Sequence, residues 1–132
     1  MTHVNARPLI LIVEDHPDTR QMYAEFLDSL FEVIQAADGQ EALAVLERSV
    51  PTVIITDLSL PGIDGFELVG QIRANPATAH VPVICLTGHV GHTLDQRARA
   101  AGFDRVLMKP CLPDALAHAV LEMVRLRRSP SV

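Results

Sequence analysis

The chain has 132 residues, of which 48% are hydrophobic and 20% charged, and its formal net charge at pH 7 is −5. These values fit a single globular domain and are untypical of a disordered chain. The longest strongly apolar run covers only residues 9–13, which excludes a membrane span. Two acidic residues follow it directly, so it does not fit a secretory signal peptide either.

The charge is unevenly distributed along the chain. Residues 1–66 contain eleven acidic residues and three arginines, which argues against nucleic-acid binding because a binder must neutralise phosphates. The basic cluster at 125–128 is more typical of a solvated helix end. We therefore expect no direct DNA binding and no membrane association. The two cysteines, Cys85 and Cys111, form no disulfide framework, which favours a reducing, cytoplasmic location.

Short aliphatic runs alternate with helical patterns from one end of the chain to the other. The runs predict strands at 8–14, 32–36, 52–57, 81–87 and 104–108. The segments between and after them predict helices at about 17–30, 39–49, 64–74, 91–101 and 112–127. The runs are continuous rather than alternating, as in parallel strands that are covered on both faces. The pattern predicts an α/β fold with an open, doubly wound, five-stranded parallel sheet.

The predicted helices differ in their apolar faces. The first carries five large apolar residues at helical spacing: Met22, Tyr23, Phe26, Leu27 and Leu30. The helix at 91–101 has only a thin stripe, made of Leu94, Ala98 and Ala101. Because it would bury little apolar surface, we expect this helix to be among the least stable parts of the domain.

Two further helices have starts that are typical of a capping box. Asp38 and Asp64 are each followed three residues later by a glutamate, Glu41 and Glu67. In such a box the aspartate accepts a hydrogen bond from the helix backbone and the glutamate reaches back to the capping residue. Both boxes are predicted to fix the starts of the helices at 39–49 and 64–74.

Polar residues follow four of the predicted strands. Glu14 and Asp15 end the first strand, Asp57 the third, Thr87 the fourth and Lys109, the only lysine of the chain, the fifth. In an open α/β sheet, ligands bind beyond the carboxyl ends of the strands. Each residue taken singly could be an ordinary strand end or turn former, but their coincidence at one sheet edge predicts a functional site.

The types of residue at this edge indicate the chemistry. Three neighbouring carboxylates repel one another unless a cation neutralises them. Carboxylate oxygens are hard ligands that suit Mg²⁺, with Mn²⁺ a second possibility, and no zinc-type set of histidine and cysteine is present. A divalent ion with a lysine and a threonine hydroxyl stabilises phosphoryl charge. A strand-end aspartate can then serve as the nucleophile.

Four stretches, LILIVEDH, VIITDLSLPGIDGFEL, VPVICLTG and AGFDRVLMKP, together resemble the receiver domain of bacterial two-component response regulators. The resemblance covers residues 8–127 and leaves 1–7 and 128–132 as flexible tails. It implies a flavodoxin/CheY-like sheet in order 2-1-3-4-5 with five flanking helices. It also implies that Asp57 accepts a phosphoryl group from a phosphohistidine of a histidine kinase or histidine phosphotransfer protein.

The resemblance also implies roles for the surrounding residues. Mg²⁺ would be held by Asp15 and Asp57 directly, by Glu14 through water, and by the backbone carbonyl of Ser59. Thr87 and Lys109 would contact the phosphoryl oxygens, and the peptide bond between Lys109 and Pro110 would be cis.

Other positions bear on lifetime and output. In the family, the positions of Ser59 and His89 border the path of the water that hydrolyses the aspartyl phosphate. The position of Val106 is usually aromatic and couples phosphorylation to output, so a readout through a ring is in doubt here. We expect phosphorylation to switch the surface formed by 88–111 for contact with a downstream protein. The helix at 91–101 and the loop before it are the segments expected to move.

Three alternatives remain at this stage. The chain could be a receiver excised from a hybrid histidine kinase or longer regulator, or a receiver-like scaffold that works without phosphorylation. A phosphatase of the haloacid-dehalogenase type also uses a strand-end aspartate with Mg²⁺, but it needs a second carboxylate where this chain has Ser59. We therefore expect no enzyme, but a signalling phosphoacceptor that assists only its own phosphorylation and dephosphorylation.

Overall fold

The structure of the protein is a computed structural model that describes residues 7–89 and 91–128. The predicted tails, 1–7 and 128–132, thus lie almost wholly outside the described residues. Arg7 is described, and its guanidinium donates a hydrogen bond of 2.6 Å to the backbone carbonyl of Asp28.

Ten elements alternate along the chain, each within a few residues of its predicted bounds. The strands are β1 (Leu9–Val13), β2 (Glu32–Ala36), β3 (Val53–Asp57), β4 (Val83–Thr87) and β5 (Arg105–Met108). The helices are α1 (Pro17–Asp28), α2 (Gly39–Arg48), α3 (Gly65–Ala74), α4 (His92–Ala101) and α5 (Pro113–Arg128).

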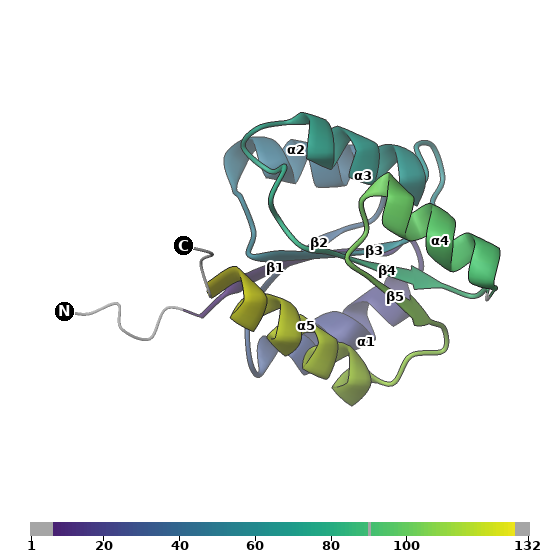
Figure 1. Cartoon of the computed structure of the whole chain (residues 1–132). Coiled ribbons are helices and arrows are strands. Elements are labelled where there is room, and N and C mark those ends of the chain that lie inside the picture. Colours follow the sequence, from purple (N-terminus) through teal and green to yellow (C-terminus); the bar gives the residue numbers. More distant parts are fainter. Residues whose placement is uncertain (1–6, 90, 129–132) are drawn as a thin grey trace.

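The five strands form one parallel sheet in the order β2-β1-β3-β4-β5, which confirms the predicted topology. Figure 1 shows α2, α3 and α4 on one face of the sheet and α1 and α5 on the other. Asp57 lies opposite Leu86, and Thr87 lies opposite Met108. The ends of β3, β4 and β5 therefore meet at one edge of the sheet.

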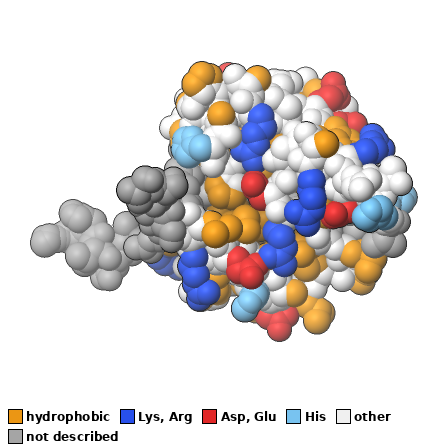
Figure 2. Space-filling model, in the orientation of Figure 1, with side chains coloured by type: hydrophobic (Ala, Val, Ile, Leu, Met, Phe, Trp, Pro, Cys, Tyr) orange, Lys and Arg blue, Asp and Glu red, His pale blue; other side chains and the backbone are white. Residues whose placement is uncertain are grey.

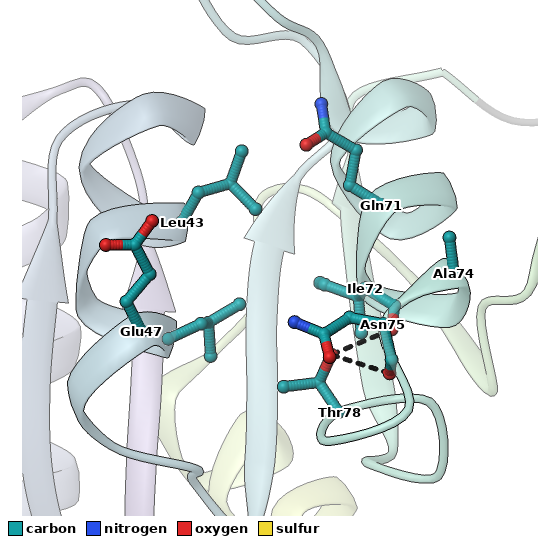
Figure 3. A pocket seen from close by; sticks show the side chains of 8 residues that line it. Leu43, Glu47, Gln71, Ile72, Ala74, Asn75 and Thr78 are labelled. Carbon is teal, nitrogen blue, oxygen red and sulfur yellow. Dashed lines mark hydrogen bonds between the residues drawn. The ribbon is translucent and has the colours of Figure 1, made fainter.

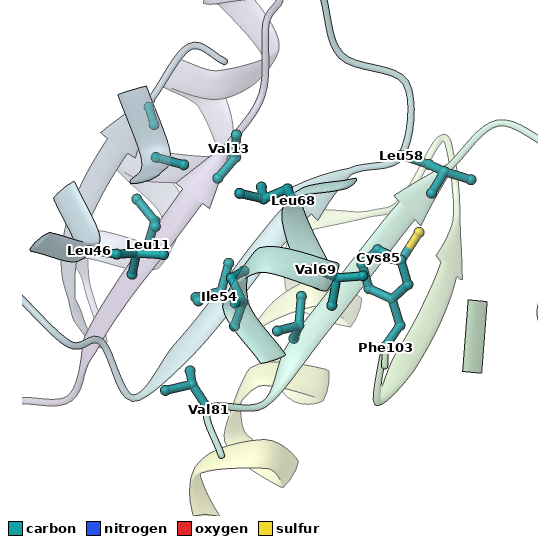
Figure 4. Close-up of a cluster of buried hydrophobic side chains, with 14 of the residues drawn as sticks. Leu11, Val13, Leu46, Ile54, Leu58, Leu68, Val69, Val81, Cys85 and Phe103 are labelled. Atoms are coloured by element: carbon teal, nitrogen blue, oxygen red, sulfur yellow. The ribbon is translucent and has the colours of Figure 1, made fainter. Parts of the chain in front are cut away.

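The core is divided by the sheet into two hydrophobic clusters. Side chains alternate between the two faces along each strand, so Leu11 and Val13 pack under α2 and α3, whereas Ile10 and Ile12 pack against α1 and α5. All four are fully buried, which explains why β1 reads as an uninterrupted apolar run. Figure 4 shows the first cluster.

The predicted apolar face of α1 is only partly correct. Tyr23 and Leu27 are buried, but Met22, Phe26 and Leu30 are 43%, 39% and 44% exposed. Met22 and Phe26 are four residues apart and form a second stripe beside the buried one, whereas Leu30 lies in the turn that follows the helix. α1 therefore presents an apolar edge to the surface.

The two predicted capping boxes also differ. Asp64 and Glu67 form a complete box at the start of α3. At α2 the Asp38 carboxylate accepts the Glu41 N–H at 2.8 Å, but Glu41 accepts from the backbone N–H of Ala37 instead. The prediction was thus wrong for the second half of this box, because the glutamate reaches one residue further back.

α4 is attached firmly at one end only. Ala98 is its only buried residue, as its thin apolar stripe predicts. The residue at the N-cap is Gly91, which has no side chain to cap the free N–H groups of the first turn. At the other end the Arg73 guanidinium donates to the carbonyl of Gly102 at 2.7 and 3.0 Å and pairs with Asp104 at 2.8 Å. Arg73 also donates to the carbonyls of Ala79 and Val81. We call this set of contacts the Arg73 clamp.

Candidate functional site

Three of the predicted edge residues contact one another directly. The Lys109 Nζ lies 2.8 Å from Oδ1 and 3.0 Å from Oδ2 of Asp57, and 3.0 Å from Oε1 of Glu14. These residues follow or end β5, β3 and β1. The sheet therefore brings one cation between two carboxylates that are far apart in the sequence.

The backbone around these side chains fixes their directions. Glu14 is completely buried; its Oε2 accepts the N–H of His16 at 3.0 Å, and its carbonyl accepts from Arg20 at 2.9 Å. The Lys109 N–H donates to the carbonyl of Thr87 at 2.8 Å, which continues the β4–β5 pairing by one residue. The peptide bond between Lys109 and Pro110 is cis.

Gly65 allows the start of α3 to approach this edge. A Cβ at Gly65 would lie 2.7 Å from the carbonyl oxygen of Asp57 and 2.8 Å from the Cα of Leu58. Neither backbone atom can move without shifting the end of β3. Only glycine fits this close contact, which seats α3 against the strand that carries Asp57.

Burial, hydrogen bonds and nearby charges shift the pKa values of Asp57 and Glu14 in opposite directions. Burial raises the pKa of Asp57 to about 6; hydrogen bonding to Lys109 lowers it, and the nearby charge of Glu14 adds to the rise. For Glu14, burial also acts to raise the pKa, but hydrogen bonds from the His16 N–H and from Lys109 outweigh it and bring the pKa below its usual value. Burial acts to lower the pKa of Lys109, but both carboxylates raise it more. As pH falls, the first proton is therefore taken up by Asp57.

Thr87 ends β4 with its hydroxyl held in place. The side chain is 4% exposed, and its Oγ accepts the backbone N–H of His89 at 3.1 Å. The hydroxyl proton remains to be donated elsewhere. Val106 is only partly buried and borders a cavity of about 140 Å³ that is lined by Thr87, His89, Gly91, Leu94, Asp95, Val106 and Met108. A small side chain thus stands next to open space at this position of β5.

A larger, open cavity of about 600 Å³ adjoins the acidic residues on the α4 side. Its lining residues are Asp15, Leu58, Ser59, Leu60, Pro61, Asp64, Phe66, Leu94 and Arg97. We call it the α4 cavity. Asp15 and Ser59, both predicted to hold the metal, thus lie in its wall.

The metal prediction fits the donors at this edge. Three carboxylates and a backbone carbonyl are hard oxygen ligands of the kind that Mg²⁺ prefers. Both oxygens of Glu14 already accept hydrogen bonds, one from Lys109 and one from the His16 N–H. Asp15, whose side chain is 33% exposed, is more accessible.

Sequence reasoning missed His16. Its Nδ1 lies 3.4 Å from Oε2 of Glu14 and 3.8 Å from Oδ1 of Asp15. Among the described residues, these three offer ligand atoms within 4.8 Å of one another. The position directly after the acidic pair was the only available signal, because His16 shares no metal-type spacing with another histidine or cysteine.

Comparison with known proteins identifies the family. The family model described as "Response regulator receiver domain" matches residues 10–121. The chain belongs to this family. A receiver domain of this type is the phosphoacceptor of two-component signalling, and such domains typically bind Mg²⁺.

Solved receiver domains share the fold over nearly their whole length. The chemotaxis response regulator CheY4 of Vibrio cholerae is 33% identical with a TM-score of 0.85, and the match covers 89% of this chain and 99% of that one. A CheY-like receiver domain protein from Methanospirillum hungatei is 26% identical with a TM-score of 0.86 and covers 93% of this chain and 98% of the other.

Curated relatives include one of similar length and several far longer proteins. An uncharacterised 14.6 kDa protein of Leptolyngbya boryana is 36% identical over 89% of this chain and 85% of its own length. The sensor histidine kinase RcsC of Salmonella typhi is 34% identical over 85% of this chain, which spans only 12% of that kinase. Within the described residues, no helix has the length and hydrophobicity needed to cross a membrane.

A separate cavity of about 360 Å³ lies between α2 and α3 (Figure 3). It is lined at the carboxyl ends of these helices by residues that include Glu47 and Asn75. Thr78 closes it from below by donating its hydroxyl to the carbonyl of Ile72 at 2.8 Å. Because the helices run antiparallel to the strands, this cavity lies at the opposite end of the sheet from Asp57 and takes no part in the site.

Proposed function

We propose that this receiver domain accepts a phosphoryl group on Asp57 from a phosphohistidine of a histidine kinase or histidine phosphotransfer protein, in a reaction that requires Mg²⁺. The observation that carries the proposal is the contact of Lys109 with both Asp57 and Glu14 at the sheet edge. It keeps a buried aspartate ionised at neutral pH and leaves a cation beside the atom that would react.

The reaction follows from these groups. A carboxylate oxygen of Asp57 attacks the phosphorus; the bond between phosphorus and the imidazole nitrogen of the donor breaks, and that nitrogen keeps the electron pair. Lys109 then turns from the carboxylate to a phosphoryl oxygen, and the Thr87 hydroxyl donates to another. A compact ammonium suits this position better than the broad planar fork of arginine.

The metal would be held by the residues at the same edge. Asp15 and Asp57 are the direct carboxylate ligands in this proposal, with the backbone carbonyl of Ser59, and Glu14 acts through water. Held by these residues, Mg²⁺ (or Mn²⁺) would supply positive charge that neutralises the transferred phosphoryl group. The burial of Glu14 and its two hydrogen bonds support the indirect role given to it.

Ser59 and His89 are proposed to tune the lifetime of the aspartyl phosphate. Both are exposed and lie two residues beyond Asp57 and Thr87. Serine leaves the approach of water open, and the imidazole of His89 can hydrogen-bond that water. The protein is in this view a signalling phosphoacceptor that affects only its own phosphorylation and dephosphorylation.

Incubation with acetyl phosphate and Mg²⁺, followed by intact-mass measurement, tests the assignment of Asp57. The wild-type protein is expected to gain one phosphoryl group, and Asp57→Asn none, because the amide is no nucleophile. A chelator should abolish the gain. Labelling of both proteins would place the acceptor elsewhere, and labelling of neither would favour a scaffold that works without phosphorylation. Sustained hydrolysis of a small phosphate ester would revive the phosphatase alternative.

An apolar groove beside Lys109 supports a helical phosphodonor. It measures about 590 Å³, and its lining residues are His16, Thr19, Met22, Tyr23, Lys109, Pro110, Cys111, Leu112 and Pro113. Met22 and Leu112 are 43% and 69% exposed. Because the groove is continuous with the site, we infer that an apolar helix face of the phosphohistidine protein lies there.

A charged side chain in this groove should slow phosphoryl transfer from a phosphohistidine protein but not from acetyl phosphate. Met22→Glu is expected to slow transfer from a phosphohistidine protein about tenfold, because a carboxylate would be desolvated in the contact. Labelling by acetyl phosphate should not change. Val50→Glu is the matched control, since Val50 is 45% exposed and lies after α2, at the other end of the sheet. Equal slowing by both substitutions would remove the groove from the proposal.

Output through the surface of 88–111 remains a proposal, as does the downstream protein that reads it. The face carrying α4, β5 and α5 shows basic, acidic and hydrophobic side chains intermixed (Figure 2), which suits a contact with another protein. The chain spans only 12% of the sensor histidine kinase RcsC. That it forms part of a longer hybrid kinase is therefore a second proposal. The cytoplasmic location stays a prediction.

A further inference from the structure

Arg97 projects from α4 toward the mouth of the site. Its guanidinium carbon lies 4.8 Å from the centroid of the Phe66 ring, and Phe66 itself packs edge-on against Phe103 at 6.2 Å. Arg97 also lines the α4 cavity together with Asp15 and Ser59. Arg97 on α4 thus faces the same cavity as Asp15 and Ser59, although all three are far apart in the sequence.

The contact that holds Arg97 is a weak one. A cation over an aromatic ring at an exposed position gains little compared with an arginine that pairs with a phosphoryl group through charge-assisted hydrogen bonds. Of the two acids in the cavity wall, Asp64 is already engaged in the capping box of α3. Asp15 is the acid assigned to the metal. A phosphoryl group on Asp57 would place a charge of roughly −2 beside this cavity, about one negative charge more than the carboxylate carries, and would extend it further from the strand.

The two ends of α4 are held differently, so attraction of Arg97 to a phosphoryl group can displace the amino end of the helix. The Arg73 clamp fixes its carboxyl end at Gly102, whereas its amino end lacks a side-chain cap and only Ala98 is buried. A force applied at Arg97 would therefore turn the helix about Gly102, with the larger displacement at His92. Because the clamp lies at the far end from that displacement, it can stay intact during the motion.

We propose that Arg97 is a positioning residue that senses the phosphoryl group on Asp57, leaves the ring of Phe66 for it, and carries α4 along. The inference rests on the proposed function and extends it with a route to output. It also accounts for Val106, whose small side chain beside a cavity of about 140 Å³ provides no ring to transmit the change. In place of such a ring, Arg97 on α4 couples phosphorylation of Asp57 to the output surface.

Hydrogen exchange across residues 92–101 tests the proposal. Wild type, Arg97→Gln and Arg99→Gln are compared with and without acetyl phosphate and Mg²⁺, and intact mass is recorded for each sample. Arg99 is the matched control, because it lies on α4 but pairs with Asp95 at 3.0 Å and does not line the α4 cavity. Wild type and Arg99→Gln should show a change in protection on phosphorylation. Arg97→Gln should gain the phosphoryl group but lose that change, and Arg97→Lys should keep part of it.

Each other outcome overturns the inference. An unchanged response in Arg97→Gln would show that α4 moves without this residue. Loss of phosphorylation in Arg97→Gln alone would make Arg97 part of the transfer site rather than of the readout. A wild-type protein that gains no phosphoryl group would overturn the proposed function itself, and with it the anion that Arg97 is proposed to sense. Intact mass separates this last failure from the first two.

Discussion

Asp57→Asn is expected to unfold at a higher urea concentration than wild type at pH 7, although it should not accept a phosphoryl group. Burial, partly offset by Lys109, raises the pKa of Asp57 from 3.8 to about 6. A carboxyl with a raised pKa stabilises the fold fully only below its unfolded-state pKa, and that stability is lost as pH rises through the folded-state value. Two pKa units correspond to about 3 kcal/mol. The neutral amide avoids this loss.

The gain from Asp57→Asn should therefore depend on pH. It is expected to be near zero at pH 4, where Asp57 of wild type is protonated, to grow between pH 4 and 6, and to level off above pH 7. Urea unfolding in a chelator at several pH values measures it. Glu47→Gln, which removes an exposed carboxyl on α2, is the control and should show no such profile. If Asp57→Asn and wild type had the same urea midpoint at pH 7, the buried charge of Asp57 would not be destabilising, and the assignment would be contradicted.

Mg²⁺ should reverse part of this difference. Because the ion binds the folded state through Asp57 in the proposed site, it should stabilise wild type by mass action more than it stabilises Asp57→Asn. The two urea midpoints are thus expected to approach each other as the Mg²⁺ concentration rises. Equal shifts in both proteins would place the ion away from Asp57.

Lys109→Met is expected to have the opposite effect on stability. It keeps most of the aliphatic stem but leaves two buried carboxylates, Asp57 and Glu14, without their cation. Removing one partner of a buried ion pair is strongly destabilising, but the Lys109 side chain is 27% exposed, so we expect a loss of about 2 kcal/mol at pH 7. The pKa of Asp57 should rise further.

A double-mutant cycle separates this effect from a loss of packing. Asp57→Asn in the Lys109→Met background should recover most of the stability, because only Glu14 then remains charged. Lys109→Arg keeps the charge; it should fold and accept the phosphoryl group but lose the coupling to output. Urea unfolding and intact mass are the measurements. Additive effects of the two single substitutions would contradict a direct interaction between Lys109 and Asp57.

The parallel sheet and the position of the site could be predicted because both depend on local pattern. Four of the five strands are short apolar runs that end in or are followed by a polar residue, and parallel strands bring these ends to one edge. Glu14, Asp57 and Lys109 accordingly lie in contact. The family resemblance supplied the strand order, which the hydrogen-bonded pairs confirm.

What the sequence could not predict depends on contacts between distant residues. Arg73 and Gly102 are 29 residues apart, and no periodicity connects them. The contact of Arg97 with Phe66 joins two helices in the same way. The exposure of Met22 on α1 was missed for a different reason: helical spacing shows which residues share a stripe, but not how wide a stripe the neighbouring helix covers.

The single lysine makes the site chemically addressable. Lys109 carries the only side-chain amine of the protein, so a reagent that acylates amines meets no other lysine. Its ammonium is held by two carboxylates and only 27% exposed, so its nucleophilicity depends directly on what occupies the site. Acylation at this one atom would remove the charge that Asp57 relies on. The extent of labelling at the Lys109 Nζ, located by peptide mass, therefore reports the state of the phosphoacceptor.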